Sequence, residues 1–245
     1  MKSVNLKCLS ASALKIIAMV CMLCDHIWAT LPYAPMLLTA LGRVAFPIFA
    51  FLMAEGHAHT RDIRRYRKRL LLLAVVTEIP FNLMCSGSVI YPFHQNVIWT
   101  FLLSSLCVDM IRQAQEQKTA VAILKAAAMT LVGYLTGYIL FVDYHGEGVL
   151  MVLIFWLLRG SRWYHRLGQA ACLYWINVEM LKGQMLLLPL AGKTVEVPLQ
   201  GLALLALIPI WLYRGKQGYH SKVLQYVFYA FYPVHLLILG LLKFL

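Results

Sequence analysis

The chain has 245 residues, of which 61% are hydrophobic and only 13% are charged, and its mean hydropathy is +0.72. Soluble domains carry roughly 25% charged residues, so this composition excludes a soluble enzyme. The formal net charge of +12 is explained by Lys and Arg in the connections of a membrane protein, and no nucleic-acid partner is expected.

The apolar residues gather in blocks of about 16 to 23, close to the roughly 20 residues that an α-helix needs to cross lipid. This pattern predicts an all-α fold, a polytopic integral membrane helix bundle of about nine transmembrane helices. In chain order the predicted spans are Ser12–Leu31, Ala34–Glu55, Leu70–Cys85, Asn96–Ile111, Ala120–Val142, Gly148–Leu158, Leu167–Leu181, Pro198–Tyr213 and Lys222–Phe244.

The sixth predicted span is short, because its 11 residues rise only about 16 Å against a hydrocarbon core of roughly 30 Å. The distribution of Lys and Arg residues nevertheless supports this span. With nine spans and a cytoplasmic N-terminus, 17 of the 22 Lys and Arg residues lie inside and three lie outside. Without this span the three arginines of 159–166 would lie outside, against the positive-inside tendency. We therefore predict the N-terminus in and the C-terminus out, with residues 143–148 dipping below the outer surface beside a cavity.

No internal repeat or long linker divides the sequence, so residues 1–245 are expected to form a single transmembrane domain in the inner or plasma membrane. The six cysteines suggest no disulfide framework. Cys21 and Cys24 have metal-like spacing but no second ligand pair nearby in sequence, so no metal is expected. His57 and His59 fall in a basic cytoplasmic connection, where we expect them to be solvated.

Ionisable and amide residues inside the predicted spans are the informative ones, since they are costly in lipid and mark functional sites. They fall at similar depth, in the outer half. Asp25 and His26 are adjacent, so on a helix they point about 100° apart and would find partners across helices. The candidate catalytic residues are Asp25, His26, Arg43, Glu78 and His235, and the candidate substrate-binding residues are Asn82, Asn96, Asp143, His145 and Glu147.

Two interpretations of these residues are open. An imidazole near a carboxylate in a partly wet cavity is suited to general acid and base catalysis near neutral pH. Alternatively, the groups satisfy one another as polar contacts between helices, as Arg43 would if it paired with Asp25 or Glu78.

The dense basic run Arg64–Arg69 also has two interpretations. It is typical of a topogenic stop beside anionic lipid headgroups. It could instead clamp the phosphates of a cytosolic cofactor, because arginine binds phosphate bidentately.

Several motifs, in order along nearly the whole chain, resemble the TraX (F-pilin acetylase) family. They are Leu14–Met19 leading to Asp25-His26, then Leu41–Phe51, Glu55-Gly56, Thr60-Arg61, Tyr66–Leu70, Glu78–Asn82 and Phe231–His235. The resemblance implies acetyl transfer from acetyl-CoA to the N-terminal amine of a membrane-inserted pilin subunit. The chain is also similar to the wider group of membrane acyltransferases, in which a histidine late in the first helix is catalytic and basic residues at the cytoplasmic face hold acyl-CoA. This likeness implies that His26 is the general base and that acyl-CoA is held by Arg61, Arg64, Arg65, Arg67 and Arg69.

We therefore expect a membrane-embedded acyltransferase that moves an acyl group from cytosolic acyl-CoA to an amine or hydroxyl reached from the outer side or the lipid. The acceptor could be a peptide such as pilin, a lipid or a small molecule. A proton-coupled secondary transporter would also bury Asp25, Glu55, Glu78 and His235, although the polar residues crowd one leaflet instead of lining a path. A non-catalytic assembly factor would need polar contacts alone.

Overall fold

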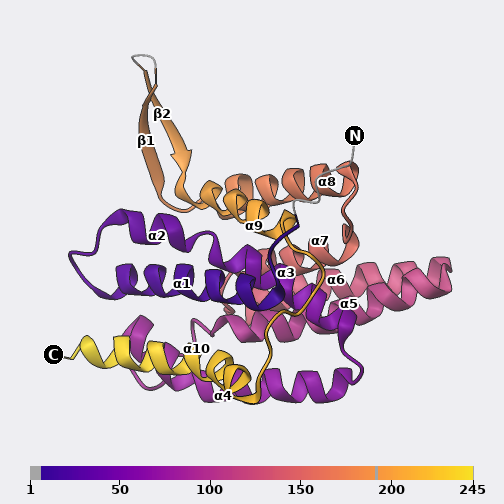
Figure 1. The fold of residues 1–245 in the computed structure, drawn as a ribbon, viewed down its shortest axis with the longest axis horizontal. Helices are drawn as coiled ribbons and strands as arrows, with labels where there is room; N and C mark the ends of the chain where they lie inside the picture. The colour runs from indigo at the N-terminus through magenta and orange to yellow at the C-terminus, as the bar shows by residue number, and fades with distance from the viewer. Residues whose placement is uncertain (1–6, 191–192, 245) are drawn as a thin grey trace. The chain divides into compact units, whose positions relative to one another are not determined.

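The computed structural model describes residues 7–190 and 193–244, which are mostly helical (Figure 1). The helices and strands, in chain order, are α1 (Ala11–Thr30), α2 (Met36–Gly42), α3 (Ala45–His59), α4 (Ile63–Ser86), α5 (Val97–Gln117), α6 (Ala120–Ile139), α7 (His145–Leu157), α8 (Trp163–Tyr174), the π-helix η1 (Trp175–Leu181), β1 (Met185–Leu190), β2 (Lys193–Pro198), the 3₁₀-helix η2 (Leu199–Ala206), α9 (Leu207–Trp211) and α10 (Lys222–Leu242).

Six helical segments are long and apolar enough to cross a membrane, and the protein is a multi-pass membrane protein. They are Ala11–Thr30, Met36–His59, Ile63–Ser86, Val97–Gln117, Ala120–Ile139 and Lys222–Leu242. Two shorter apolar helices, His145–Leu157 and Leu199–Trp211, occur among the described residues. Each of the nine predicted spans thus corresponds to a helical stretch, and the helical bundle expected from the sequence is confirmed.

Local hydrogen bonds place several helix ends where the sequence pattern did not. Asp62 caps α4 by accepting a hydrogen bond from the Arg65 backbone N–H at 2.9 Å, so the helix begins at Ile63, before the apolar run. The basic run is therefore the first turns of α4 and not the loop that we predicted. At the other end Gly87 closes α4 with a left-handed φ of 73°, which glycine adopts without strain.

Three other boundaries differ from the prediction. The second span is interrupted at Arg43 and Val44, which separate α2 from α3. Helix α7 begins at His145, so most of the predicted irregular stretch 143–148 is helical. The connection after η1 forms an antiparallel pair of strands, in which Met185 lies opposite Pro198, and the sequence analysis did not anticipate it.

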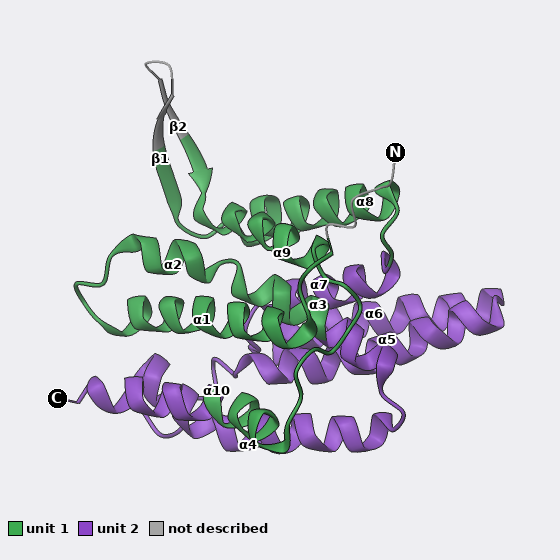
Figure 2. Cartoon of the chain, viewed as in Figure 1, with its two compact units in different colours: residues 1–52, 160–231 green, residues 53–159, 232–245 purple. Residues whose placement is uncertain are grey.

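The chain divides into two compact units (Figure 2). Unit 1 comprises Met1–Leu52 and Gly160–Phe231, and unit 2 comprises Met53–Arg159 and Tyr232–Leu245. In unit 1, α1 packs against α2, and Leu14, Ala18 and Leu173 are fully buried.

In unit 2, α7 packs against both α5 and α6, and four of its side chains, Val149, Met151, Val152 and Phe155, are essentially inaccessible. A helix that is apolar on all sides is a core element. This burial explains why so short a helix is so hydrophobic.

Candidate functional site

An ion pair inside unit 1 joins two of the predicted catalytic residues. The Arg43 guanidinium donates to the Asp25 carboxylate, and both side chains are about one-fifth exposed. Thr39 Oγ1 donates to Asp25 Oδ1 at 2.7 Å and accepts from Arg43 Nη2 at 3.1 Å. Of the two partners considered for Arg43 under the polar-contact interpretation, Asp25 is the one that it binds, and Thr39 was missed.

Close packing of α1 on α2 makes this pair possible. A Cβ atom added at Gly42 would lie 2.3 Å from the Cβ of Asp25, a distance that side chains cannot tolerate. The glycine therefore lets the two helices approach closely enough for Asp25 to reach Thr39 and Arg43.

The network continues through two buried amides that the sequence analysis did not select. Arg43 Nη1 donates to Gln200 Oε1 at 3.1 Å, and Gln200 Nε2 donates to Asn177 Oδ1 at 2.9 Å. Asn177 in turn donates to the Leu173 carbonyl oxygen at 2.8 Å. Both amides lie in predicted apolar segments, so their polarity at those positions was the signal that could have found them. They hold the guanidinium in a defined place.

His26 follows Asp25 on α1 and is half-buried. Its backbone carbonyl accepts a hydrogen bond from Thr30 Oγ1 at 2.7 Å. Because neighbouring residues on a helix point about 100° apart, the imidazole leaves the helix in a different direction from the Asp25 carboxylate. The Asp25 carboxylate therefore binds Arg43.

A second polar cluster, in unit 2, is built around Glu78 of α4. Asn96 Nδ2 donates to Glu78 Oε2 and, at 2.9 Å, to the Ala74 carbonyl oxygen. Trp99 Nε1 donates to the same carboxylate oxygen at 3.0 Å. Asn96 is completely buried and also caps α5 by accepting from the Ile98 N–H. The structure therefore brings Glu78 and Asn96 together, and it adds Trp99, which sequence reasoning missed.

Asn82 lies one turn further along α4 and is 4% exposed. Its Nδ2 donates to the Val89 carbonyl oxygen at 3.3 Å, whereas its Oδ1 is buried without a hydrogen-bond partner. Glu78 Oε1 likewise has none. Asn82 and Glu78 thus place two unfilled acceptor atoms on one face of α4, since residues four apart are neighbours on a helix.

Asp143, in the connection between α6 and α7, pairs with a histidine that the sequence analysis did not select. His94 Nε2 lies 3.5 Å from Asp143 Oδ1. This hydrogen-bonding contact, with a smaller contribution from Cys85, raises the pKa of His94 to about 10. Asp143 also interacts electrostatically with the buried Tyr232 of α10, whose ring centroid lies 5.8 Å from that of the buried His235. Tyr232 is therefore a neighbour of His235 and lies within electrostatic range of Asp143.

Glu147, in the first turn of α7, is 3% exposed. Its Oε1 accepts hydrogen bonds from the hydroxyls of Tyr134 and Tyr138 of α6, the first at 3.1 Å. The Tyr138 ring stacks on that of His145 with a centroid separation of 5.0 Å. His145 and Glu147 were predicted, and the two tyrosines were missed because tyrosine in an apolar helix is ordinarily a membrane-interface residue.

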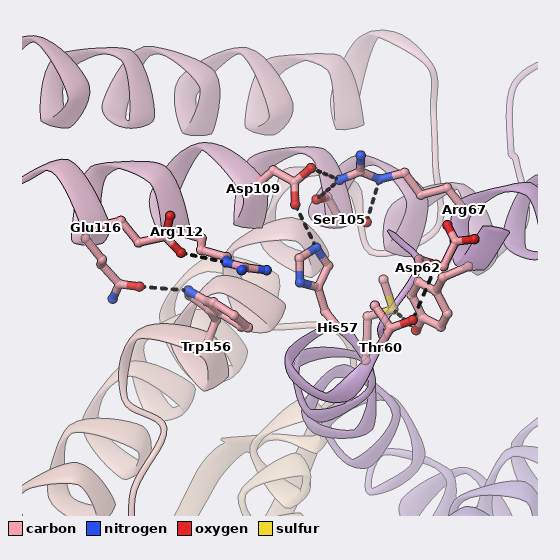
Figure 3. A network of polar contacts seen from close by, with 12 residues as sticks. His57, Thr60, Asp62, Arg67, Ser105, Asp109, Arg112, Glu116 and Trp156 are labelled. Atoms are coloured by element: carbon pink, nitrogen blue, oxygen red, sulfur yellow. Dashed lines mark hydrogen bonds and ion pairs between the residues drawn. The ribbon is translucent and has the colours of Figure 1, made fainter. Parts of the chain in front are cut away.

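The five arginines predicted to hold acyl-CoA divide into two groups. Arg67 donates to Asp109 Oδ2 and to the Ser105 carbonyl oxygen, both at 2.6 Å, and to Ser105 Oγ at 2.9 Å (Figure 3). It therefore ties α4 to α5. The exposed group consists of Arg61, Arg64, Arg65 and Arg69.

Figure 3 also shows His57 of α3 directed towards Asp109 of α5. The expectation that His57 is solvated is wrong, because the residue is 2% exposed. Its Nε2 lies 3.2 Å from Asp109 Oδ1, at ion-pair distance but without hydrogen-bond geometry, and its ring lies edge-to-face against Trp156. His57 fills the space beside the Arg67–Asp109 pair.

Comparison with known proteins agrees with the motifs. The family model described as "TraX protein" matches residues 10–243. A relative from Dichelobacter nodosus, named "Probable fimbrial assembly protein FimC, serogroup H1", is 28% identical over 249 residues, which cover 94% of each protein. No solved structure matches the chain. Because the family match spans nearly all of the sequence, the chain belongs to the TraX family.

Proposed function

We propose that this protein is a membrane acyltransferase that moves an acyl group, in the simplest case acetyl, from cytosolic acyl-CoA to an amine or hydroxyl. The observation that carries the proposal is the Asp25–Arg43 ion pair, held by Thr39 and Gln200, with Asp25 directly preceding His26 in a membrane helix. Membership of the TraX family supports it.

In the proposed reaction His26 acts as general base. Its imidazole takes the proton of the acceptor amine or hydroxyl as the acceptor atom bonds to the thioester carbonyl carbon. The tetrahedral oxyanion collapses, the carbon–sulfur bond breaks, and the imidazolium returns the proton to the departing CoA thiolate. A two-step path through an acyl-imidazole would use the same residue.

Arg43 is proposed to stabilise the oxyanion by its charge. Its hydrogen bonds to Asp25, Thr39 and Gln200 fix the guanidinium before the substrate binds. Asp25 orients the guanidinium by accepting one of its hydrogen bonds. Glu78 and His235 are proposed as further proton-transfer groups, and Asn82, Asn96, Asp143, His145 and Glu147 as contacts of the acceptor.

The donor's phosphates are proposed to bind the exposed arginines of the first turns of α4 and the residues before it, Arg61, Arg64, Arg65 and Arg69. Guanidinium groups that are exposed at the start of a helix are free to bind phosphate from the solvent. Arg67 would contribute mainly by holding α4 against α5 through Asp109 and Ser105.

We further propose one domain of nine spans in the inner or plasma membrane, with the N-terminus in and the C-terminus out. Backbone contacts support an even number of crossings between the first helix and residue 217, because the Ala11 and Ser12 N–H groups donate to the Lys216 and Gln217 carbonyl oxygens, both at 3.0 Å. In unit 2, Arg159 after α7 pairs with Glu55 near the end of α3. This contact supports a crossing by α7, which would bring Arg159 to the cytoplasmic side.

The acceptor is proposed to be a membrane-inserted peptide such as pilin. The support is the relative's name, which describes a probable fimbrial assembly protein. An acyl group on the terminal amine of such a subunit would remove one positive charge.

The proposal is tested by release of CoA from acetyl-CoA by the purified full-length protein in detergent, with and without an acceptor peptide. His26→Ala and His26→Gln should both lose roughly 10²-fold or more in turnover, because neither side chain can take up a proton. His220→Gln, at an exposed histidine, is the matched control and should retain turnover. Near wild-type turnover in His26→Gln at equal thermal stability would exclude His26 as the base, and no CoA release by the wild type with any amine or hydroxyl would favour a transporter or assembly factor.

A further inference from the structure

Glu147 differs from the other buried acid in that no cation among the described residues pairs with it. Among the described acidic residues, Glu55 and Glu147 are the two that are buried. Glu55 pairs with Arg159, whereas Glu147 forms no ion pair with a described Lys, Arg or His and receives only two tyrosine hydroxyls. Its Oε2 is buried and has no hydrogen-bond partner. A buried carboxylate ordinarily has a positive partner, so the surroundings of Glu147 call for a positively charged ligand.

The groups around Glu147 are those that recognise an ammonium ion. The Tyr134 and Tyr138 rings lie 5.3 Å apart and are tilted by 59°, and the Tyr138 ring stacks on His145. Aromatic faces attract organic cations, and the free Oε2 would accept an N–H. His145 Nδ1 is a second buried atom without a hydrogen-bond partner.

The backbone holds this cluster in a strained arrangement. The backbone φ values of Phe141, Tyr144 and His145 are 52°, 60° and 42°, which residues other than glycine rarely adopt. A Cβ at Gly146 would lie 2.4 Å from the Tyr134 ring, and one at Gly137 would lie 2.7 Å from the His145 backbone. Strain of this kind concentrates at ligand sites. The favourable position of Glu147 near the start of α7 offsets only a small part of the cost of burying its charge.

We propose that Glu147, Tyr134, Tyr138 and His145 bind the primary ammonium group of a membrane lipid headgroup, as in phosphatidylethanolamine. The exposed surface of α6 indicates the direction of entry. Tyr138 is 41% exposed although its hydroxyl reaches Glu147. Around it the exposed side chains are apolar and suited to lipid, namely Leu131, Leu135, Ile139, Leu140 and Phe141. Tyrosine at the end of a 20-residue membrane helix lies at headgroup depth.

The test compares two zwitterionic lipids, because anionic lipids would also bind the basic surface. Full-length protein is incubated with micelles containing dioleoyl phosphatidylethanolamine or dioleoyl phosphatidylcholine, whose trimethylammonium has no N–H, and retained lipid is counted by native mass spectrometry. The wild type should retain about tenfold more phosphatidylethanolamine than Glu147→Gln, since the variant lacks the charge for a charge-assisted hydrogen bond. Glu116→Gln, at an exposed glutamate, is the matched control and should behave like the wild type.

A second variant covers a failure of Glu147→Gln to fold. Tyr134→Phe with Tyr138→Phe keeps the rings and the carboxylate but removes both hydroxyls that hold Oε1, and it should retain less phosphatidylethanolamine than the wild type. Equal retention of the two lipids by the wild type would overturn the proposal, as would undiminished retention in both variants. If a peptide with a free N-terminal amine binds in a Glu147-dependent way and phosphatidylethanolamine does not, the lipid assignment is wrong. These measurements use lipid binding alone, so they do not depend on the proposed acyl transfer.

Discussion

At the scale of single residues, the polar groups of this protein act as matched sets. The Asp25 carboxylate binds the Arg43 guanidinium, and Thr39 and Gln200 accept further hydrogen bonds from it. Removing one member of a buried pair leaves an uncompensated charge, which costs more than the intact pair contributes. The effect of a substitution within such a set on stability should therefore depend on the shape of the new side chain as well as on its charge.

Arg43→Lys tests this distinction. Lysine keeps the charge but cannot reproduce the planar contacts to Asp25, Thr39 and Gln200. We expect the variant to lose about 1–3 kcal/mol of stability, since the pair is partly exposed, and to lose most CoA release. Arg43→Ala should be less stable than Arg43→Lys. The measurement is thermal unfolding in detergent beside turnover, and equal stability of wild type and Arg43→Ala would contradict a structural role for the pair.

The His94–Asp143 pair predicts a dependence of stability on pH. The pKa of His94 is raised to about 10, chiefly by the hydrogen-bonding contact with Asp143, from an ordinary value of 6.5. A raised pKa means that the folded state holds the proton more tightly. The contribution to stability is therefore fully present below about pH 6.5 and is lost as the pH rises through about 10. Because the imidazole is 39% exposed, solvent keeps this contribution modest.

Thermal unfolding temperatures measured between pH 6 and pH 10.5 check this prediction. His94→Gln should flatten the decline that the wild type shows across this range, and His220→Gln, at an exposed histidine, should not. An unchanged pH profile in His94→Gln would show that the pair does not stabilise the fold.

At the scale of elements, the sequence predicted which segments are helical better than where they begin. Nine apolar blocks correspond to helical stretches because hydrophobic length is a local property. The start of α4 depends on one side chain, Asp62, and Arg43, at the interruption between α2 and α3, is bound by Asp25 of α1 and by Gln200, which are distant in sequence. In the strand pair at 185–198 the alternation of polar and apolar residues is confined to the four residues 194–197 of β2, because β1 is apolar throughout.

The candidate site shows the same division between local and distant information. Charged residues inside apolar blocks were recognisable one at a time, so Asp25, Arg43 and Glu78 were selected, and Glu147 was selected from the connection 143–148. Their uncharged partners, such as Thr39, Gln200 and Trp99, become apparent only when the helices are packed.

Close helix packing predicts the effect of one added methyl group. Gly42→Ala would place a Cβ against Asp25, so we expect a loss of about 1–3 kcal/mol from overpacking, together with disturbance of the Arg43 pair. Gly201→Ala is a suitable control, because its Cβ would meet Val178 at an ordinary 3.4 Å. Thermal unfolding of the two variants should separate them, and similar stability would mean that α1 and α2 have room to move apart.

Substitutions of neighbouring arginines in the first turns of α4 should have two different effects. Arg64→Ala with Arg65→Ala should raise the KM for acetyl-CoA in a salt-dependent way while leaving folding intact, because both side chains are exposed. Arg67→Ala should instead lower thermal stability, because it leaves Asp109 and Ser105 without their shared partner. Arg214→Ala with Lys216→Ala removes an equal exposed charge elsewhere and is the control. An unchanged KM in the well-folded Arg64/Arg65 variant would refute the phosphate clamp.

At the scale of the whole molecule, the decisive property is how many times the chain crosses the membrane. Six segments are long enough to cross on their own, and the shorter α7 is surrounded by other helices of unit 2. Burial removes the need for a lipid-length apolar surface, because irregular or short backbone is tolerated at membrane depth where protein surrounds it. A count by length alone would therefore leave α7 out even if this helix crosses.

Two positions distinguish the possible topologies. With nine spans, Glu196 of β2 lies outside and Gln217, before α10, lies inside. If only the six long segments cross, both positions lie outside, and if α7 alone fails to cross, Glu196 lies inside and Gln217 outside.

Single cysteines at these positions, in a background without the six native cysteines, are labelled in intact cells with a membrane-impermeant maleimide. Pro92, which each of these topologies places outside, is the positive control, and Gln117, which each places inside, is the negative control. We expect labelling at Glu196 and protection at Gln217, because Gln217 shares backbone hydrogen bonds with Ser12 at the start of α1 and must lie on the same side of the membrane. Labelling at Gln217 would remove a crossing from the nine-span topology, and if α7 were the span that fails, Arg159 would lose its cytoplasmic placement beside Glu55.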